Sequence, residues 1–375
     1  MDYQYLKCIT PIDGRYNSKT NELVGYFSEM SFNKYRILIE VEYLISLGKL
    51  EIYDDLDEPM IEFLRDIYKK FNLEECIKLK KIEEKINHDV KAVEYYLRDK
   101  INLKDNSLEM VNYIHFGLTS QDINSSANML MIKQSIGKVI LPKMNDILTK
   151  LKKKILEWSK IPLLAKTHGQ SASPTFLGKE ILVFYERLVI QSRKLNGINY
   201  TTKFGGANGN FNAHHMALPN VDWIEFANKF TKIFGLERNQ YTTQIDHYDN
   251  YAEIFDNLKR INVIMVDFCQ DIWFYISRGI LVQKINEGEV GSSTMPFKVN
   301  PINFENAEGN FLLANSLLEF FSRKLPISRL QRDLTDSTIL RNVGSAFSYI
   351  LIALSSFETG FDKLDINKKQ IDKEL

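Results

Sequence analysis

The chain of 375 residues and 43.7 kDa is long enough to form two or three domains around a large core. Its 48 basic and 48 acidic side chains balance, which argues against nucleic acid or an acidic membrane surface as a partner. Three dispersed cysteines, no apolar N-terminal segment and no run of about 18 apolar residues indicate a soluble, cytoplasmic protein without disulfides or a thiolate metal site.

Three long helices are predicted in the middle of the chain. Prolines and glycines are sparse, and between them apolar residues recur every three or four positions. The first helix ends before Lys160 and should kink at Pro142, the second begins near Pro174, and the third covers residues 250–284. A helix as long as the third would span roughly 50 Å.

The third helix carries apolar side chains on more than one face. Val263, Ile264, Trp273 and Tyr275 would need more than one neighbour to cover them. No alternating strand pattern is visible. We therefore predict an all-α protein, built on a bundle of long helices that is shared between subunits.

The helical pattern breaks at about residue 107 and again at about residue 356, which predicts three units. Residues 1–107 would form short helices with solvated charge runs. Residues 108–355 would form the long-helix bundle and carry most of the polar motifs. Residues 356–375 begin a third helical unit and then stop, so we expect that unit to be truncated.

Polar motifs lie where predicted helices begin or end, and two of them lie in the N-terminal unit. PIDGRY contains Arg15 and Tyr16, which form either a surface turn or a phosphate contact through the guanidinium fork. INHDVKAVEYYL places Asn87, His88 and Asp89 where an apolar helix begins. Asn and Asp are common helix caps, but a partly buried histidine between them needs hydrogen-bond partners.

Two further motifs precede helices in the middle unit. IHFGLTSQDIN places Thr119 and Ser120 at a helix start, where hydroxyl groups cap the helix and also suit an anion site. LLAKTHGQSASP places Thr167, His168 and Gln170 beside a glycine. A histidine in such a loop is a better catalytic candidate than one on an apolar face.

The segment FGGANGNFNAHH is rich in glycine and asparagine but follows no predicted strand, so we reject a dinucleotide-binding loop. His214 and His215 within it lack a metal partner at helical spacing, and a metal site is not expected.

Near the end of the middle unit, RLQRDLTDSTILRN combines cations with hydroxyl groups. Arg332, Ser337, Thr338 and Arg341 are spaced either as a phosphate site or as an ordinary charged helix end. Gln244, in YTTQID, is a further polar candidate.

Residues 288–310 read GEVGSSTMPFKVNPINFENAEGN. The glycines predict a mobile loop rather than packed core, and a loop with serines, one lysine and one amide suits a lid over an anion. Its candidate site residues are Ser292, Lys298, Asn300 and Asn306.

This string resembles the signature loop of the fumarase/aspartase superfamily (GSSxMPxKxNP), and KVNPINFEN, NHDVKAVE, THGQ and TTQID are most similar to the adenylosuccinate lyase family. The resemblance covers nearly the whole chain, from PIDGRY to RDLTDSTILRN. It implies a homotetramer with each site built from three chains. It also implies no metal or organic cofactor, and β-elimination of fumarate from adenylosuccinate and from succinyl-aminoimidazole-carboxamide ribotide.

The resemblance further implies a role for each motif. Ser292 would be the base, with its alkoxide stabilised by Lys298, and Asn300 would help to stabilise charge on the succinyl carboxylate. His168 would be the general acid, and His88 would position the substrate or share that role. The remaining implied substrate-binding residues are Arg15, Tyr16, Asn87, Asp89, Thr119, Ser120, Thr167, Gln170, Gln244, Asn306, Arg332, Ser337, Thr338 and Arg341.

The chain departs from the family's sequence pattern at one position, and several alternative functions stay open. Phe297 stands where many members of the family have histidine, which leaves the acid role to His168 and His88. Argininosuccinate lyase, fumarase and aspartase share the loop, but Arg15, Arg332 and Arg341 favour a nucleotide substrate. A catalytically silent helical scaffold is the alternative from a different class.

Overall fold

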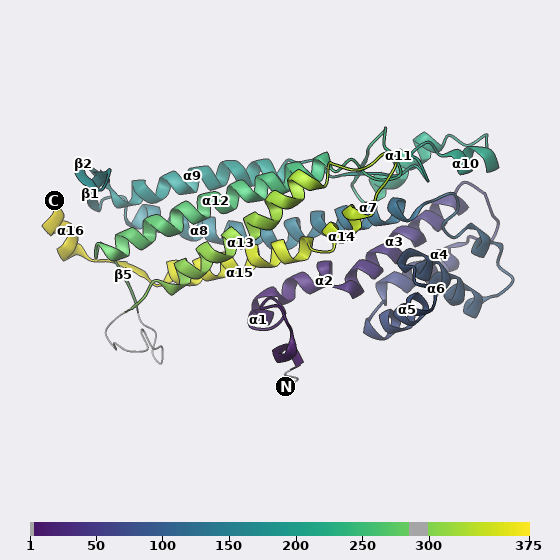
Figure 1. Cartoon of the computed structure of the whole chain (residues 1–375), viewed down its shortest axis with the longest axis horizontal. Helices are drawn as coiled ribbons and strands as arrows, with labels where there is room; N and C mark the ends of the chain where they lie inside the picture. Colours follow the sequence, from purple (N-terminus) through teal and green to yellow (C-terminus); the bar gives the residue numbers. More distant parts are fainter. Residues whose placement is uncertain (1–3, 285–298) are drawn as a thin grey trace.

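A computed structural model describes residues 4–284 and 299–375, and over these residues the molecule is an elongated helical bundle with a smaller helical lobe at one end (Figure 1). In the bundle, α12 packs against α9 and α13, α13 packs against α15, and α8 packs against α9. The prediction of an all-α bundle is confirmed. The bundle helices are α8 (Leu141–Glu157), α9 (Leu177–Asn196), α12 (Asp249–Ser277), α13 (Ile302–Lys324) and α15 (Val343–Asp362).

The lobe and the N-terminal arm consist of shorter helices that precede the bundle in the sequence. Within them, α3 packs against α4 and α7, and α5 packs against α6. The elements are η1 (Gln4–Lys7), α1 (Asn17–Thr20), η2 (Asn21–Leu23), α2 (Val24–Phe27), α3 (Glu29–Gly48), α4 (Glu58–Lys69), α5 (Leu73–Ile86), α6 (Asp89–Lys104), η3 (Glu109–Tyr113) and α7 (Ser120–Ser135).

Short elements connect the long helices. Strands β1 and β2 pair antiparallel, β3 and β4 pair parallel, and β5 and β6 pair antiparallel. The elements are β1 (Pro162–Thr167), β2 (Gln170–Phe176), β3 (Thr201–Thr202), α10 (Asn212–Ala217), α11 (Trp223–Ile233), β4 (Glu237–Arg238), β5 (Leu281–Gln283), α14 (Thr335–Leu340), β6 (Leu364–Ile366) and α16 (Lys368–Glu374).

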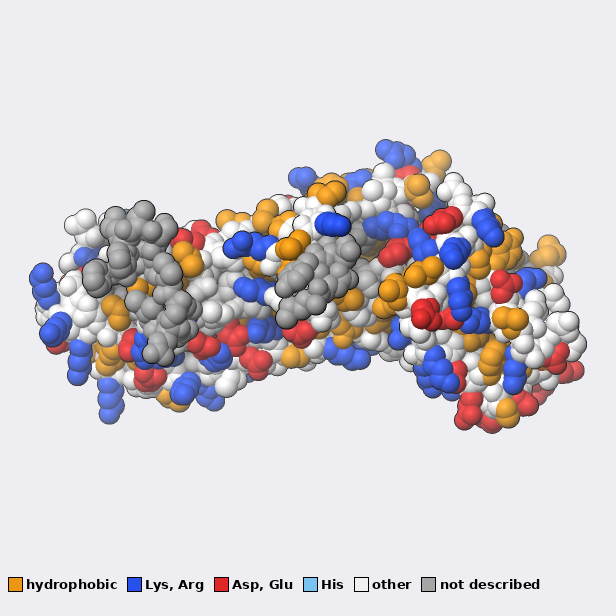
Figure 2. Space-filling model, turned by 90° about the horizontal axis from the view of Figure 1, so that it is seen from below, with side chains coloured by type: hydrophobic (Ala, Val, Ile, Leu, Met, Phe, Trp, Pro, Cys, Tyr) orange, Lys and Arg blue, Asp and Glu red, His pale blue; other side chains and the backbone are white. Residues whose placement is uncertain are grey.

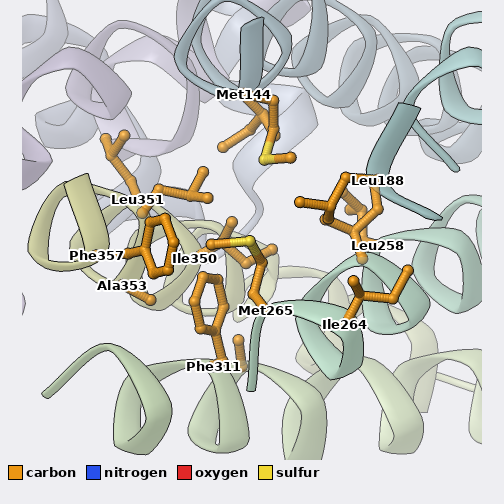
Figure 3. Close-up of a cluster of buried hydrophobic side chains, with 14 of the residues drawn as sticks. Met144, Leu188, Leu258, Ile264, Met265, Phe311, Ile350, Leu351, Ala353 and Phe357 are labelled. Carbon is orange, nitrogen blue, oxygen red and sulfur yellow. The ribbon is translucent and has the colours of Figure 1, made fainter. Parts of the chain in front are cut away.

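The described residues form two hydrophobic cores. The bundle core holds side chains from all five long helices, including Met144, Leu188, Met265, Phe311 and Ile350 (Figure 3). The lobe core gathers α3 to α7 but also residues from 204–230. The predicted unit 1–107 therefore shares its core with later parts of the chain.

Helix α15 runs without a break through residue 356, where the third unit was expected to begin. Its Phe357 is completely buried in the bundle core. The stretch Thr335–Asp362, which includes α15, is long and apolar enough to cross a bilayer, but 61% of its apolar window is buried inside the molecule. Packing against α13 accounts for this apolar composition.

The third long helix was predicted to reach residue 284, but α12 ends at Ser277. Gly279 adopts a φ of 73°, its N–H bonds the carbonyl of Ile276, and the N–H of Ile280 bonds the carbonyl of Tyr275. This pair of bonds is a Schellman motif, which ends a helix at a left-handed glycine. Periodicity alone missed it because Ile280 is buried beyond the helix end.

The sequence showed no alternating strand pattern, but the THGQ motif lies in a short β-hairpin. His168 and Gly169 have φ values of 54° and 74°, as the two central residues of a type I′ turn require, and they join β1 to β2. Pro174 lies in β2, so the second long helix begins at Leu177 rather than near Pro174. The strands show no alternating pattern because β2 has no buried residue.

The helical ladder is disrupted just before Pro142, where a kink was predicted. A π-helical turn over Ile136–Ile140 joins α7 to α8 just before this proline. A π turn accommodates a local disruption of the helical ladder without ending the helix.

Apolar side chains remain exposed along the bundle. On α12, Val263 is half exposed and Ile264 is buried, so the prediction of apolar groups on both faces is confirmed. Basic and acidic side chains are interspersed over the face in Figure 2, consistent with the neutral net charge. The exposed apolar residues of the long helices are Leu156, Leu182, Val183, Ile190, Val263, Trp273, Phe274, Ile302, Leu312, Leu313 and Phe320.

The continuity of α15 can be tested by a matched pair of substitutions. Phe357→Ala should lower the free energy of unfolding by about 3–5 kcal/mol, because it opens a cavity in the bundle core. Thr359→Ala, two residues further along at an exposed position, should change it by about 0.5 kcal/mol or less. Urea denaturation at one protein concentration measures both. Equal, small effects would contradict a bundle core that extends beyond residue 356.

Candidate functional site

Several of the predicted site residues lie where the lobe joins the bundle. We call the contacting set Asp89, Gln244, Arg332, Ser337 and Arg341 the junction cluster. Arg341 Nη2 donates to Asp89 Oδ2 at 3.0 Å, and Arg332 approaches Gln244 Oε1 and Ser337 Oγ, both at 3.5 Å. Thr119 and Ser120 lie next to it, because the following Gln121 donates to Ser337 Oγ at 3.3 Å.

Two helices begin at the junction cluster. His88 is the N-cap of α6, and its Nδ1 accepts the Lys91 N–H at 3.1 Å. Thr119 is the N-cap of α7. Helix N-termini carry unsatisfied N–H groups and a positive partial charge, so two of them beside arginines favour an anion.

The arginines of this region differ in how firmly they are held. Arg341 is half exposed, and its second contact, to Glu29, is long at 3.5 Å. Among residues 4–284 and 299–375, Arg332 hydrogen-bonds at the two 3.5 Å contacts given above, which is the weak limit of hydrogen bonding. These two guanidinium groups can therefore exchange their present partners for a bound anion.

Arg36 of α3 is a residue that sequence reasoning missed. It is 1% exposed and donates to Asp89 at 2.5 Å, to Asn124 at 2.9 Å and to Asn33 at 3.1 Å. Burial raises the pKa of the Asp89 carboxyl, but the charge and hydrogen bond of Arg36, the Val90 N–H and the Arg341 charge together outweigh burial and lower it. Asp89 thus stays ionised and ties Arg36 to Arg341. The feature of the sequence that could have pointed to Arg36 is the presence of a basic residue within the apolar helix α3.

The space enclosed at the junction is small in the single chain. Arg36, Asp89, Ser337 and Arg341 line a cavity of about 30 Å³, roughly the volume of one water molecule. A larger groove of about 190 Å³, between the N-terminal arm and the start of α15, is also lined by Arg341. The groove of about 740 Å³ between α8 and α9 contains none of the predicted site residues.

The predicted residues of THGQ lie at the opposite end of the bundle (Figure 1). Thr167, His168 and Gln170 are exposed at the turn between β1 and β2. The hairpin continues directly into α9, whose 20 residues extend about 30 Å before the chain returns toward α7 through β3. His168 therefore lies far from the junction cluster of its own chain.

A third group lies near the start of α13. Asn306 Nδ2 donates to Tyr16 Oη at 3.0 Å, and Ser356 Oγ donates to Asn306 Oδ1 at 2.7 Å. Two residues predicted from separate motifs thus meet, with Arg15 exposed beside them. Asn300 is partly buried just before α13.

The remaining predicted residues are less informative. Asn87 ends α5 in a left-handed conformation, and Thr338 is exposed on α14 with its carbonyl bonded to Asn342. Ser292 and Lys298, together with Phe297, lie outside the described residues. Within residues 4–284 and 299–375, no group of three or more His, Cys, Asp or Glu side chains is placed to hold a metal ion.

Two histidines near the junction are structural. His115 Nδ1 contacts Glu40 at 2.5 Å, and its Nε2 lies 3.8 Å from Glu94. Burial lowers the pKa of His115, but Glu40 and Glu94 outweigh burial and raise it above 6.5. His214 is completely buried against Tyr43, and burial lowers its pKa to about 4.

Two family models match the chain. Residues 14–312 match the model described as lyase, and residues 328–375 match the one described as adenylosuccinate lyase C-terminal.

The chain is also similar to curated proteins and solved structures. It is 50% identical to adenylosuccinate lyase of Dictyostelium discoideum, over 99% of this chain and 81% of that protein. It is 47% identical to adenylosuccinate lyase of Legionella pneumophila, over 99% and 82%. A structure of fumarate lyase from Mesorhizobium sp. BNC1 superimposes with a TM-score of 0.77 at 17% identity, over 95% of this chain and 78% of that one. This last similarity shows that the two proteins share a fold.

His115 and His214 should shift stability with pH in opposite directions. Because the folded-state pKa of His115 is raised, its contribution is full below about pH 6.5 and is lost as the pH rises through that raised pKa. Because the pKa of His214 is lowered, its neutral ring stabilises the fold above about pH 6.5, and this is lost as the pH falls toward 4.

The measurement is the melting temperature as a function of pH. His115→Gln should cost most below about pH 6.5, and the cost should shrink at alkaline pH. The exposed His215→Gln serves as the control and should leave the profile unchanged. A cost of His115→Gln that grows with pH would contradict the ion pair with Glu40.

Proposed function

The chain belongs to the adenylosuccinate lyase family, and we propose that it cleaves adenylosuccinate to AMP and fumarate. It is an enzyme of the lyase class. We extend the proposal to the release of fumarate from succinyl-aminoimidazole-carboxamide ribotide, which also carries a succinyl group on nitrogen and a ribose phosphate.

The observation that carries this proposal is the junction cluster. Arg332, whose two contacts are long, and Arg341, which is half exposed and paired with Asp89, lie beside the N-termini of α6 and α7 and the hydroxyl of Ser337. Arginine forks and helix N-termini both suit phosphate and carboxylate groups. A substrate with one phosphate and two carboxylates supplies an anion for each of these elements.

Elimination requires a base, an acid and a group that stabilises charge on the carboxylate. We assign Ser292 as the base and Lys298 with Asn300 as the stabilising groups. We assign His168 as the acid that protonates the leaving nitrogen. Thr119 and Ser120 would hold the succinyl carboxylate, and the remaining predicted polar residues would bind the nucleotide.

His88 suits a positioning role better than the role of acid. Its Nδ1 accepts the Lys91 N–H, so the neutral ring carries its proton on Nε2. That tautomer can donate one hydrogen bond to the substrate while the ring remains fixed as a helix cap. His168 is exposed at a turn and is not engaged as a cap.

We further propose that the active enzyme is a homotetramer with sites shared between chains. About 30 Å of α9 lies between the hairpin of His168 and the elements near the junction. Acid catalysis requires contact within about 3 Å. A second chain, packed on the exposed apolar side chains of α9, α12 and α13, would bring its hairpin to the junction cluster.

The balanced charge, dispersed cysteines and buried apolar stretch of α15 support a cytoplasmic enzyme that binds neither nucleic acid nor a membrane. We propose that it works without a metal or an organic cofactor, because the base, the acid and the stabilising groups are all side chains.

The reaction can be tested by ultraviolet absorbance with adenylosuccinate as substrate. The wild-type chain should form AMP and fumarate, and Ser292→Ala should lose at least about a thousandfold in kcat, because it removes the base. Activity that persists in Ser292→Ala would keep the reaction and overturn the assignment of the base. A tetramer without turnover would indicate a silent scaffold.

Sharing of sites can be tested by mixing two inactive variants. Asparagine is suitable at both histidines, because it can cap α6 at position 88 and tolerates the positive φ at position 168. His88→Asn and His168→Asn should each be nearly inactive alone. Co-expressed at equal levels, they should recover about a quarter of the wild-type activity. Each site would take His88 from one chain and His168 from another, and about one site in four would receive the wild-type residue at both positions.

Each variant expressed by itself, at the same total level, is the control for this experiment. If both histidines of a site came from one chain, no mixed tetramer would contain a complete site and the activity would not recover.

A further inference from the structure

The glycine-rich segment rejected as a nucleotide loop meets the α7 N-terminus at one buried carboxylate. Asp122 accepts the Thr119 N–H at 2.8 Å on Oδ2. Its Oδ1 accepts Lys203 Nζ at 2.7 Å and the N–H groups of Gly205 and Gly206 at 2.7 and 3.1 Å. Both Asp122 and Lys203 are 0% exposed. The carboxylate thus joins the turn that carries Thr119 and Ser120 to residues 203–211.

The same segment also touches the loop that carries Gln244. Gly209 has a φ of 81°, and a Cβ there would lie 2.3 Å from the carbonyl oxygen of Thr242. Gly206 has a φ of 77°, and a Cβ there would lie 3.0 Å from the carbonyl oxygen of Gly117. Glycine is required at both positions, because any side chain would push the loops apart. Residues 203–211 therefore lie between the two substrate-binding loops.

Lys203 is the unusual member of this arrangement. Its ammonium group also donates to the carbonyl of Gly206 at 2.6 Å. Burial lowers the pKa of Lys203, and the Asp122 carboxylate opposes that shift. A buried ion pair contributes little to stability compared with an apolar pair of the same volume, although breaking it is costly. Its directional bonds, however, fix the distance between the two loops.

We propose that the Asp122–Lys203 pair is a positioning device for the succinyl site. The pair does not touch the substrate. It holds the Thr119–Ser120 turn against residues 203–211, and through them against the loop of Gln244, so that the carboxylate-binding hydroxyls are preorganised. This inference rests on the proposed function, because it takes Thr119 and Ser120 as the residues that bind the succinyl carboxylate.

Lys133 provides the control. It is partly buried on α7, far along that helix from Thr119, and its Nζ donates to the carbonyls of Phe234 and Gly235 at 3.0 and 2.7 Å. Lys203→Met and Lys133→Met each remove one ammonium group and its bonds to another loop. Only the first removes a bond to the Asp122 carboxylate.

Two readouts test the proposal in the full-length enzyme. Hydrogen exchange at residues 117–122 should accelerate by about tenfold or more in Lys203→Met and stay unchanged in Lys133→Met. The KM for adenylosuccinate should rise by about tenfold in Lys203→Met, with a smaller change in kcat. A merely structural defect would instead reduce the active fraction, and hence the apparent kcat, at constant KM.

The outcomes separate this inference from the proposed function. If the wild type does not turn over adenylosuccinate, the proposed function fails, and the exchange measurement still tests the contact. Unchanged exchange at residues 117–122, or an equal rise of KM in Lys133→Met, would overturn the inference. If Lys203→Met does not fold, the double variant Asp122→Asn with Lys203→Met removes both charges together, and the same two readouts and criteria apply.

Discussion

The length and stiffness of the long helices determine how this protein can work. Proton transfer requires contact distances, whereas α9 alone separates the hairpin of His168 from the elements at the junction by about 30 Å. A side chain cannot cross that distance, and among the described residues α12, α13 and α15 pack into one core along the bundle. Under the proposed function, a site that uses both groups would be assembled between chains. The exposed apolar side chains of the same helices provide a surface for that assembly.

At the junction, some charged groups are held in place by buried hydrogen bonds, and others are accessible and could bind an anion. Arg36 and Lys203 are buried and engaged on several sides, each with a carboxylate partner. Arg332 and Arg341 lie nearer the solvent and make longer contacts. Preorganised charge lowers the cost of binding only if its supports do not move, and the buried pairs supply that support. The fixed cations thus hold the geometry in which the available cations can meet an anion.

Much of this could be predicted from the sequence. Helical periodicity predicted α8, α9 and α12 of the bundle because each has an apolar stripe. The sequence motifs pointed to Gln244, Ser337 and Arg341, which the fold brings together around Arg332 and the junction cavity. Periodicity failed at Gly279, where the backbone changes conformation while the apolar pattern continues. It also failed at the β1–β2 hairpin, whose strands are too exposed to alternate. Arg36 and Lys203 were missed because only the folded chain brings their carboxylate partners to them.

Under the proposed function, the hairpin would make catalysis depend on assembly. A two-stranded ribbon is marginally stable alone, and this one is anchored near its base, where Leu163 is buried and Arg278 approaches the carbonyl of Leu164 at 3.5 Å. Its turn, with His168, is exposed in the single chain. The acid would therefore gain a defined position only when a neighbouring chain covers the turn. Dissociation would then remove activity before it disturbs the helical core, because the core of each chain is complete without the partner.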